Sequence, residues 1–141
     1  MILPIVIGLG LALAVSIAFG LAGIGRERGF YPVMLVVVAS YYDLFAVMGA
    51  SPRALFWDSV IFVGFVAAAY WGFKKNLWIV AAALAGHGIL DLAHAHVLTN
   101  PGVPKWWPMF CLSYDVAAAL YLGLLLSRSP QLTAAQVSGP R

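Results

Sequence analysis

Five apolar runs, each about as long as a membrane-spanning helix, make up most of this chain. Crossing a hydrocarbon core of ~30 Å takes about 20 mostly apolar residues in helical form. No run alternates apolar and polar residues as a barrel strand does, and a helix satisfies its own backbone groups in lipid. We therefore predict an all-α integral membrane bundle of five transmembrane helices, at 2–24, 30–50, 54–73, 77–98 and 109–127.

The composition agrees with this fold class. The chain is 63% hydrophobic and 9% charged, whereas a typical soluble domain has about 25% charged residues. The single cysteine, Cys111, excludes an intramolecular disulfide and a Cys-rich metal knuckle. The net charge of +3 comes from basic residues at the ends of the apolar runs, so we predict no nucleic-acid partner.

A single domain is predicted, with residues 1–128 forming the transmembrane bundle. The first run lacks a basic leader and is longer than the apolar part of a secretory signal, so we interpret it as a retained helix. Residues 129–141 are small and polar with two prolines, which predicts a disordered C-terminal tail.

The distribution of Lys and Arg predicts the orientation in the cell membrane. Cytoplasmic loops of membrane proteins carry an excess of Lys and Arg. One side of the predicted bundle carries Arg26, Arg28, Lys74, Lys75, Arg128 and Arg141, and the other carries only Arg53 and Lys105. We therefore place the N-terminus outside and the C-terminus in the cytoplasm.

Small residues recur every four positions along the first run, at Gly8, Ala12, Ser16 and Gly20. Such a stripe lets two helices approach closely in lipid. Packing within one chain explains the stripe most simply, and a homo-oligomer interface is the alternative.

Four of the five acidic residues fall inside predicted helices. A carboxylate at the bilayer centre costs at least ~2.5–3.5 kcal/mol, so each of them needs an explanation. From the predicted helix ends, Asp43, Asp91 and Asp115 share one level, ~10 Å below the outer surface, and Asp58 lies at ~6 Å. Three helices thus bring carboxylates to one level of the membrane.

The fourth run adds histidines to this level in the pattern H-x-x-x-D-x-x-H. At 100° per residue, His87, Asp91 and His94 lie on one stripe of the helix, and His96 points away from it. Imidazole and carboxylate together are the ligand set of zinc and non-haem iron sites. We therefore predict that His87, Asp91 and His94 bind a divalent metal, Zn or Fe.

Asp115 and Asp43 are then candidates for the catalytic base or for a carboxylate that orients a ligating histidine. Two other interpretations stay open: a proton or ion relay, and a hydrogen-bonded network that only joins helices.

The C-terminal half resembles a family of small bacterial membrane proteins catalogued only as a domain of unknown function. The residues that carry the resemblance are Gly86, His87, Asp91, His94, Asn100, Pro101, Pro108, Cys111 and Asp115. The resemblance supports the choice of site residues and implies no particular reaction.

These patterns favour a metal-dependent membrane enzyme, most simply a hydrolase acting on a membrane lipid or another apolar small molecule. A bound zinc ion lowers the pKa of its water toward ~7 and polarises a scissile carbonyl or phosphoryl group. The alternatives are a component of a proton- or ion-coupled carrier and a small structural subunit of a membrane complex.

Overall fold

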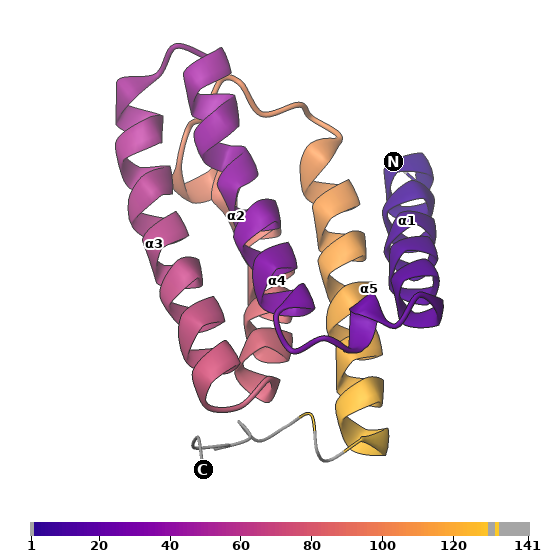
Figure 1. The fold of residues 1–141 in the computed structure, drawn as a ribbon. Coiled ribbons are helices and arrows are strands. Elements are labelled where there is room, and N and C mark those ends of the chain that lie inside the picture. The colour runs from indigo at the N-terminus through magenta and orange to yellow at the C-terminus, as the bar shows by residue number, and fades with distance from the viewer. Residues whose placement is uncertain (1, 130–131, 133–141) are drawn as a thin grey trace.

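The computed structural model describes residues 2–129 and 132 of the chain. This part folds into five α-helices joined by short loops (Figure 1). The helices are α1 (Ile2–Leu21), α2 (Phe30–Met48), α3 (Pro52–Lys74), α4 (Trp78–Val97) and α5 (Trp107–Arg128), and a 3-10 turn, η1 (Ile24–Arg26), follows α1. The all-helical prediction is confirmed. Apart from Ser129 and Leu132, the predicted disordered tail 129–141 lies outside the described residues.

Four of these helices, α1, α2, α3 and α5, are long and apolar enough to cross a membrane. Helix α4 has 20 residues, as many as α1, and it carries an apolar stretch, Trp78–His94.

One end of each of four helices, α1, α2, α3 and α5, differs by two or three residues from the sequence prediction. Helix α1 stops at Leu21 because Gly23 adopts a φ of 84°, a left-handed conformation that commonly ends helices. Helix α5 begins at Trp107, two residues before the predicted start. Pro108 is compatible with that position, because the first turn of a helix needs no N–H donor there.

Helix α5 lies between α1 and α4, while α3 packs against both α2 and α4 (Figure 1). The small-residue stripe of α1 supplies the buried residues of that helix, Gly8, Ala12 and Ser16. A Cβ atom at Gly8 would collide with the Phe110 carbonyl oxygen and the Ser113 hydroxyl of α5. The stripe therefore serves close packing within the chain, as the simpler interpretation predicted.

Two apolar clusters fill the bundle. The larger one includes Leu35, Leu84 and Leu122 and lies toward the start of α4 and the end of α5. The smaller one consists of Tyr42, Phe45, Trp107 and Cys111, near the α4–α5 loop. On α5 the buried Asp115 lies between the residues of the two clusters, and on α4 the buried His87, Asp91 and His94 follow the residues of the larger cluster.

The outer surface of the bundle is rich in large apolar side chains. Exposed examples from three helices are Leu13, Ile17, Val63, Phe56, Leu120 and Leu124. Soluble monomers rarely expose apolar patches of more than a few hundred Å². Four tryptophans, Trp57, Trp71, Trp78 and Trp106, are also exposed, whereas Trp107 is buried against Tyr41 and Phe45.

Candidate metal centre

The polar stripe of α4 faces the interior of the bundle. His87, Asp91 and His94 are 1%, 1% and 4% exposed, as expected for residues on one helical stripe. His96 is exposed, in agreement with the prediction that it belongs to another face. Ionisable side chains at this burial need partners, because an isolated buried charge is costly.

His87 is the centre of a cluster that joins α4 to α5. Its Nδ1 atom lies 2.7 Å from Asp115 Oδ2 and 3.7 Å from Asp91 Oδ2. The Cys111 Sγ atom lies 3.6 Å from the same Asp115 oxygen. One ligand atom from each of His87, Asp91, Cys111 and Asp115 lies within 4.8 Å of every other, and all four residues are buried.

Gly88 explains how the two helices come close enough for this contact. A Cβ atom at Gly88 would lie 3.2 Å from the Leu112 carbonyl oxygen and 3.3 Å from Asp115 Cβ. The bare glycine backbone therefore lets α5 pass directly beside His87, so that Asp115 reaches its ring.

Several carboxylate oxygens in the cluster have no hydrogen bond. Both oxygens of Asp91 and the Oδ1 atom of Asp115 are buried without a partner of good geometry, although the Tyr42 hydroxyl and the Cys111 thiol are neighbours of Asp91. An unsatisfied buried acceptor costs about 1–3 kcal/mol, and more when it is charged. Such groups in a folded protein call for a specific explanation, of which an ion is one.

A single divalent cation would supply the missing interactions. Zn²⁺ binds Cys sulfur at ~2.3 Å, His nitrogen at ~2.0–2.1 Å and carboxylate oxygen at ~2.0–2.2 Å. Ligand atoms around one tetrahedral ion are about 3.3–3.8 Å apart, so the four atoms, which lie within 4.8 Å of one another, are somewhat more widely spaced than bound ligands. Small side-chain rotations would bring three or four of them onto one ion.

The structure places His94, one of the three predicted ligands, outside this group. Its Nε2 atom lies 2.7 Å from Asp58 Oδ1 of α3, and its ring packs against that of Tyr42, tilted by 31° with centroids 4.0 Å apart. His94 and His87 share a helical stripe, but they meet different helices because α3 and α5 approach α4 from different sides. Cys111 takes the place in the cluster that was predicted for His94.

Asp43, the second predicted catalytic carboxylate, is also placed apart. It is half-buried on α2, and its Oδ1 atom accepts a hydrogen bond of 3.2 Å from Ser59 of α3. The prediction that Asp43, Asp91 and Asp115 share one level concerns only their depth along the helices. The rotation of α2 about its axis turns Asp43 toward α3 and away from the cluster. Of the two candidates, only Asp115 lies in the cluster.

Cys111 belongs to the four-residue cluster but was not among the predicted metal ligands or catalytic residues. Cys111 and Asp115 are four residues apart on α5, just as His87 and Asp91 are on α4, so each pair shares one helical face. That repeated spacing is a signal in the sequence. The pairing of the two faces depends on the packing of α4 against α5.

Asn100 connects the α4–α5 loop to this layer. Its amide nitrogen donates to the Tyr42 carbonyl oxygen at 3.0 Å and to Asp58 Oδ2 at 2.8 Å. Its side-chain oxygen accepts from the Gly102 N–H at 3.1 Å. The His94–Asp58 pair is therefore covered by a loop that Asn100 holds against α2 and α3.

Replacing Asn100 by alanine should destabilise the fold by about 1–3 kcal/mol, since it removes three hydrogen bonds and leaves a buried Asp58 oxygen unpartnered. Thermal unfolding of the detergent-solubilised protein measures the loss. The matched control is Thr99→Ala, an exposed neighbour in the same loop, which should be near neutral. Equal stability of the two variants would contradict the bridging role of Asn100.

No protein-family model, curated protein or solved structure matches this chain. The functional assignment therefore rests on the geometry of the cluster formed by His87, Asp91, Cys111 and Asp115.

Proposed function

We propose that all five helices span the cell membrane. The support is the exposed apolar surface together with the four helices that are long and apolar enough to cross. Helix α4 turns His87, Asp91 and His94 inward, which is how ionisable residues are accommodated in transmembrane helices. The excess of Lys and Arg in the α1–α2 and α3–α4 loops and after α5 supports an outer N-terminus and a cytoplasmic C-terminus.

Reporter fusions test this orientation. A reporter fused after Lys75 or Arg128 should be active in the cytoplasm, and one after Gly102 should be active outside, because the basic loops stay on the cytoplasmic side. Alkaline phosphatase and a fluorescent protein, which are active on opposite sides of the membrane, control for each other at every site. The reverse pattern at all three sites would refute the proposed orientation.

The function that the geometry supports best is a metal-dependent membrane hydrolase. The observation that carries it is the Asp91 carboxylate, which is buried beside His87 and Cys111 without a hydrogen bond of good geometry. We assign these three residues as ligands and Asp115 as the base. Cys must lose its proton in order to bind a metal, and metal binding releases that proton. Asp115, with an oxygen 2.7 Å from His87 and 3.6 Å from Cys111, therefore stays an unprotonated carboxylate that can act as the base.

The donor set favours zinc over iron. Non-haem iron oxygenases use two histidines and one carboxylate, whereas only one histidine belongs to this cluster. Zinc accepts sulfur, nitrogen and oxygen ligands, and its catalytic sites combine three protein ligands with one position for water or substrate.

Bound zinc would activate a water molecule and polarise the scissile group. Residues of the chain would then transfer the protons of the reaction. Asp115 accepts the proton as the water oxygen bonds to the acyl or phosphoryl centre, and it returns that proton to the leaving group as the old bond breaks. The buried Tyr42 hydroxyl, which lies beside Asp91, would be a donor for the developing negative charge.

Elemental analysis tests the metal, and an acyl-ester assay tests the reaction. Protein purified in detergent without chelator should contain close to one zinc per chain. It should also hydrolyse a long-chain p-nitrophenyl ester, and a strong chelator should abolish that activity until zinc is restored. Metal-free protein that takes up neither Zn²⁺ nor Fe²⁺ would refute the proposed function.

A metal-free network that joins helices is the second candidate. It is favoured by the two His–Asp pairs at 2.7 Å, which are complete hydrogen bonds without any ion. It leaves the free oxygens of Asp91 unexplained. The hydrolase predicts bound metal in the wild-type protein, whereas the metal-free network predicts none.

A further inference from the structure

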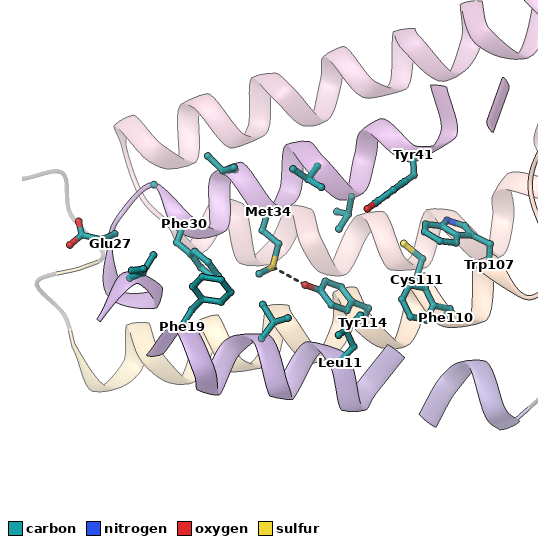
Figure 2. Close-up of a pocket in the computed structure, with 16 residues that line it drawn as sticks. Leu11, Phe19, Glu27, Phe30, Met34, Tyr41, Trp107, Phe110, Cys111 and Tyr114 are labelled. Carbon is teal, nitrogen blue, oxygen red and sulfur yellow. Dashed lines mark hydrogen bonds between the residues drawn. The ribbon is translucent and has the colours of Figure 1, made fainter. Parts of the chain in front are cut away.

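An apolar groove runs between α1 and α2, with α5 as its floor. Its volume is about 810 Å³, within the ~300–1,000 Å³ range of small-molecule pockets. The groove exists because α1 packs on α5 through its small residues and leaves the facing side of α2 uncovered. Figure 2 shows the side chains of all three helices around it.

The groove is apolar along its length and ends close to the metal centre. Its middle is walled by Val15, Val37 and Val38, and a Tyr114 hydroxyl 3.8 Å from Met34 Sδ bridges its floor. At one end Phe19 and Phe30 approach each other to 5.1 Å between ring centroids, near Glu27. At the other end lie Tyr41, Trp107 and Cys111 (Figure 2).

Shape and polarity together select the occupant. From Phe30 to Tyr41 the α2 wall is ~16 Å long at 1.5 Å per residue, which suits an extended hydrocarbon chain. The rim residues Leu11, Val33 and Val37 are exposed, so in a bilayer the groove would open sideways to lipid chains. Neutral hydrogen-bond donors that can meet a head group lie at the Cys111 end, whereas the polar side chain at the other end is the Glu27 carboxylate.

We propose that this groove binds the single linear hydrocarbon chain of an acyl lipid, with the acyl head group at Cys111 and the methyl end near Phe19 and Phe30. The link to chemistry is Cys111 itself, which both lines the groove and belongs to the four-residue cluster. This inference rests on the proposed function and narrows its substrate to long-chain acyl esters or amides.

Photolabelling with two forms of palmitic acid tests both the site and the direction of binding. One form carries a diazirine next to the carboxylate, and the other carries it next to the terminal methyl group. After irradiation in detergent, the first should label α5 around residues 107–114 and the second should label the region of Phe19 and Phe30. Unlabelled palmitate should compete with both.

Filling the groove should remove this labelling. Val15→Trp places a large ring in the middle of the groove and should reduce saturable labelling about tenfold, because the ring takes the space of the hydrocarbon chain. The matched control, Ile17→Trp, lies two residues away on the same helix, is 49% exposed and does not line the groove. It should label like wild type. Val33→Trp on the α2 rim is the second blocking variant, for use if Val15→Trp does not fold.

Metal content, measured on the same samples, separates the two proposals. Blocked variants that keep their zinc but lose labelling support the groove assignment. If the wild-type protein contains no metal but each diazirine form labels its expected region, the hydrolase proposal is refuted and the groove proposal is supported. The groove assignment is overturned if both diazirine forms label the same residues. It is also overturned if Val15→Trp is labelled as strongly as wild type. Dimer cross-links confined to α1 and α2 would also overturn it, since a second copy would then occupy the groove.

Discussion

Asp91→Asn is expected to fold and to lose the metal. The substitution keeps the shape of the side chain and removes a buried negative charge whose two oxygens have no hydrogen bond, so stability should be unchanged or higher. Metal affinity should fall at least about tenfold, because loss of even an outer partner of a metal ligand costs 10–100-fold. Size-exclusion chromatography and zinc titration measure the two effects on one preparation.

His94→Gln and Asp43→Asn are the matched controls for that prediction. Both positions carry an ionisable side chain at a similar predicted depth, but the structure places them outside the four-residue group. Both variants should therefore bind zinc like wild type. If His94→Gln lost metal as completely as Asp91→Asn, the ligand set predicted from the sequence would be right and Cys111 would have no place in it.

Gly102→Ala is expected to be the most destabilising change in the α4–α5 loop. A Cβ atom there would collide with the Phe45 carbonyl oxygen and would lie 2.7 Å from its carbon and 2.9 Å from Gly49 N. These are backbone atoms at the end of α2, so no side chain can move aside. We expect a loss of about 3 kcal/mol or more, measured as a lower midpoint of thermal unfolding in detergent.

Gly64→Ala controls for the removal of a glycine as such. Gly64 is exposed on α3, and a Cβ atom there would meet nothing within 4 Å. Because alanine is a better helix former than glycine by ~1 kcal/mol, this variant should be neutral or slightly more stable. If Gly102→Ala unfolded at the same temperature as Gly64→Ala, the close contact between the loop and α2 would be wrong.

Much of the helical layout can be predicted from the sequence. The five apolar runs locate the five helices because each is long enough to form its own backbone hydrogen bonds. Helix periodicity also places His87, Asp91 and His94 on one stripe, and all three are buried. The exact ends depend on local conformation, such as the left-handed Gly23 that stops α1 at Leu21.

The tertiary structure decides which carboxylate each buried histidine of α4 contacts. Depth in the membrane can be counted along a helix from its predicted ends. The rotation of one helix against another cannot be counted in this way, and it determines that His87 meets Asp115 while His94 meets Asp58. Gly88 lets α5 come close enough for Asp115 to contact His87, and Asn100 in the loop donates a hydrogen bond to the Asp58 that contacts His94.

The sequence by itself determined that this chain folds into apolar helices and that α4 carries buried ionisable residues, because both follow from composition and a 3.6-residue period. Only the tertiary structure decided that Cys111 joins the cluster, that Asp43 stands apart from it, and that a groove leads to it between α1 and α2. The physical reason is that these features depend on how helices distant in sequence approach and rotate, which close packing of small residues such as Gly8 and Gly88 controls.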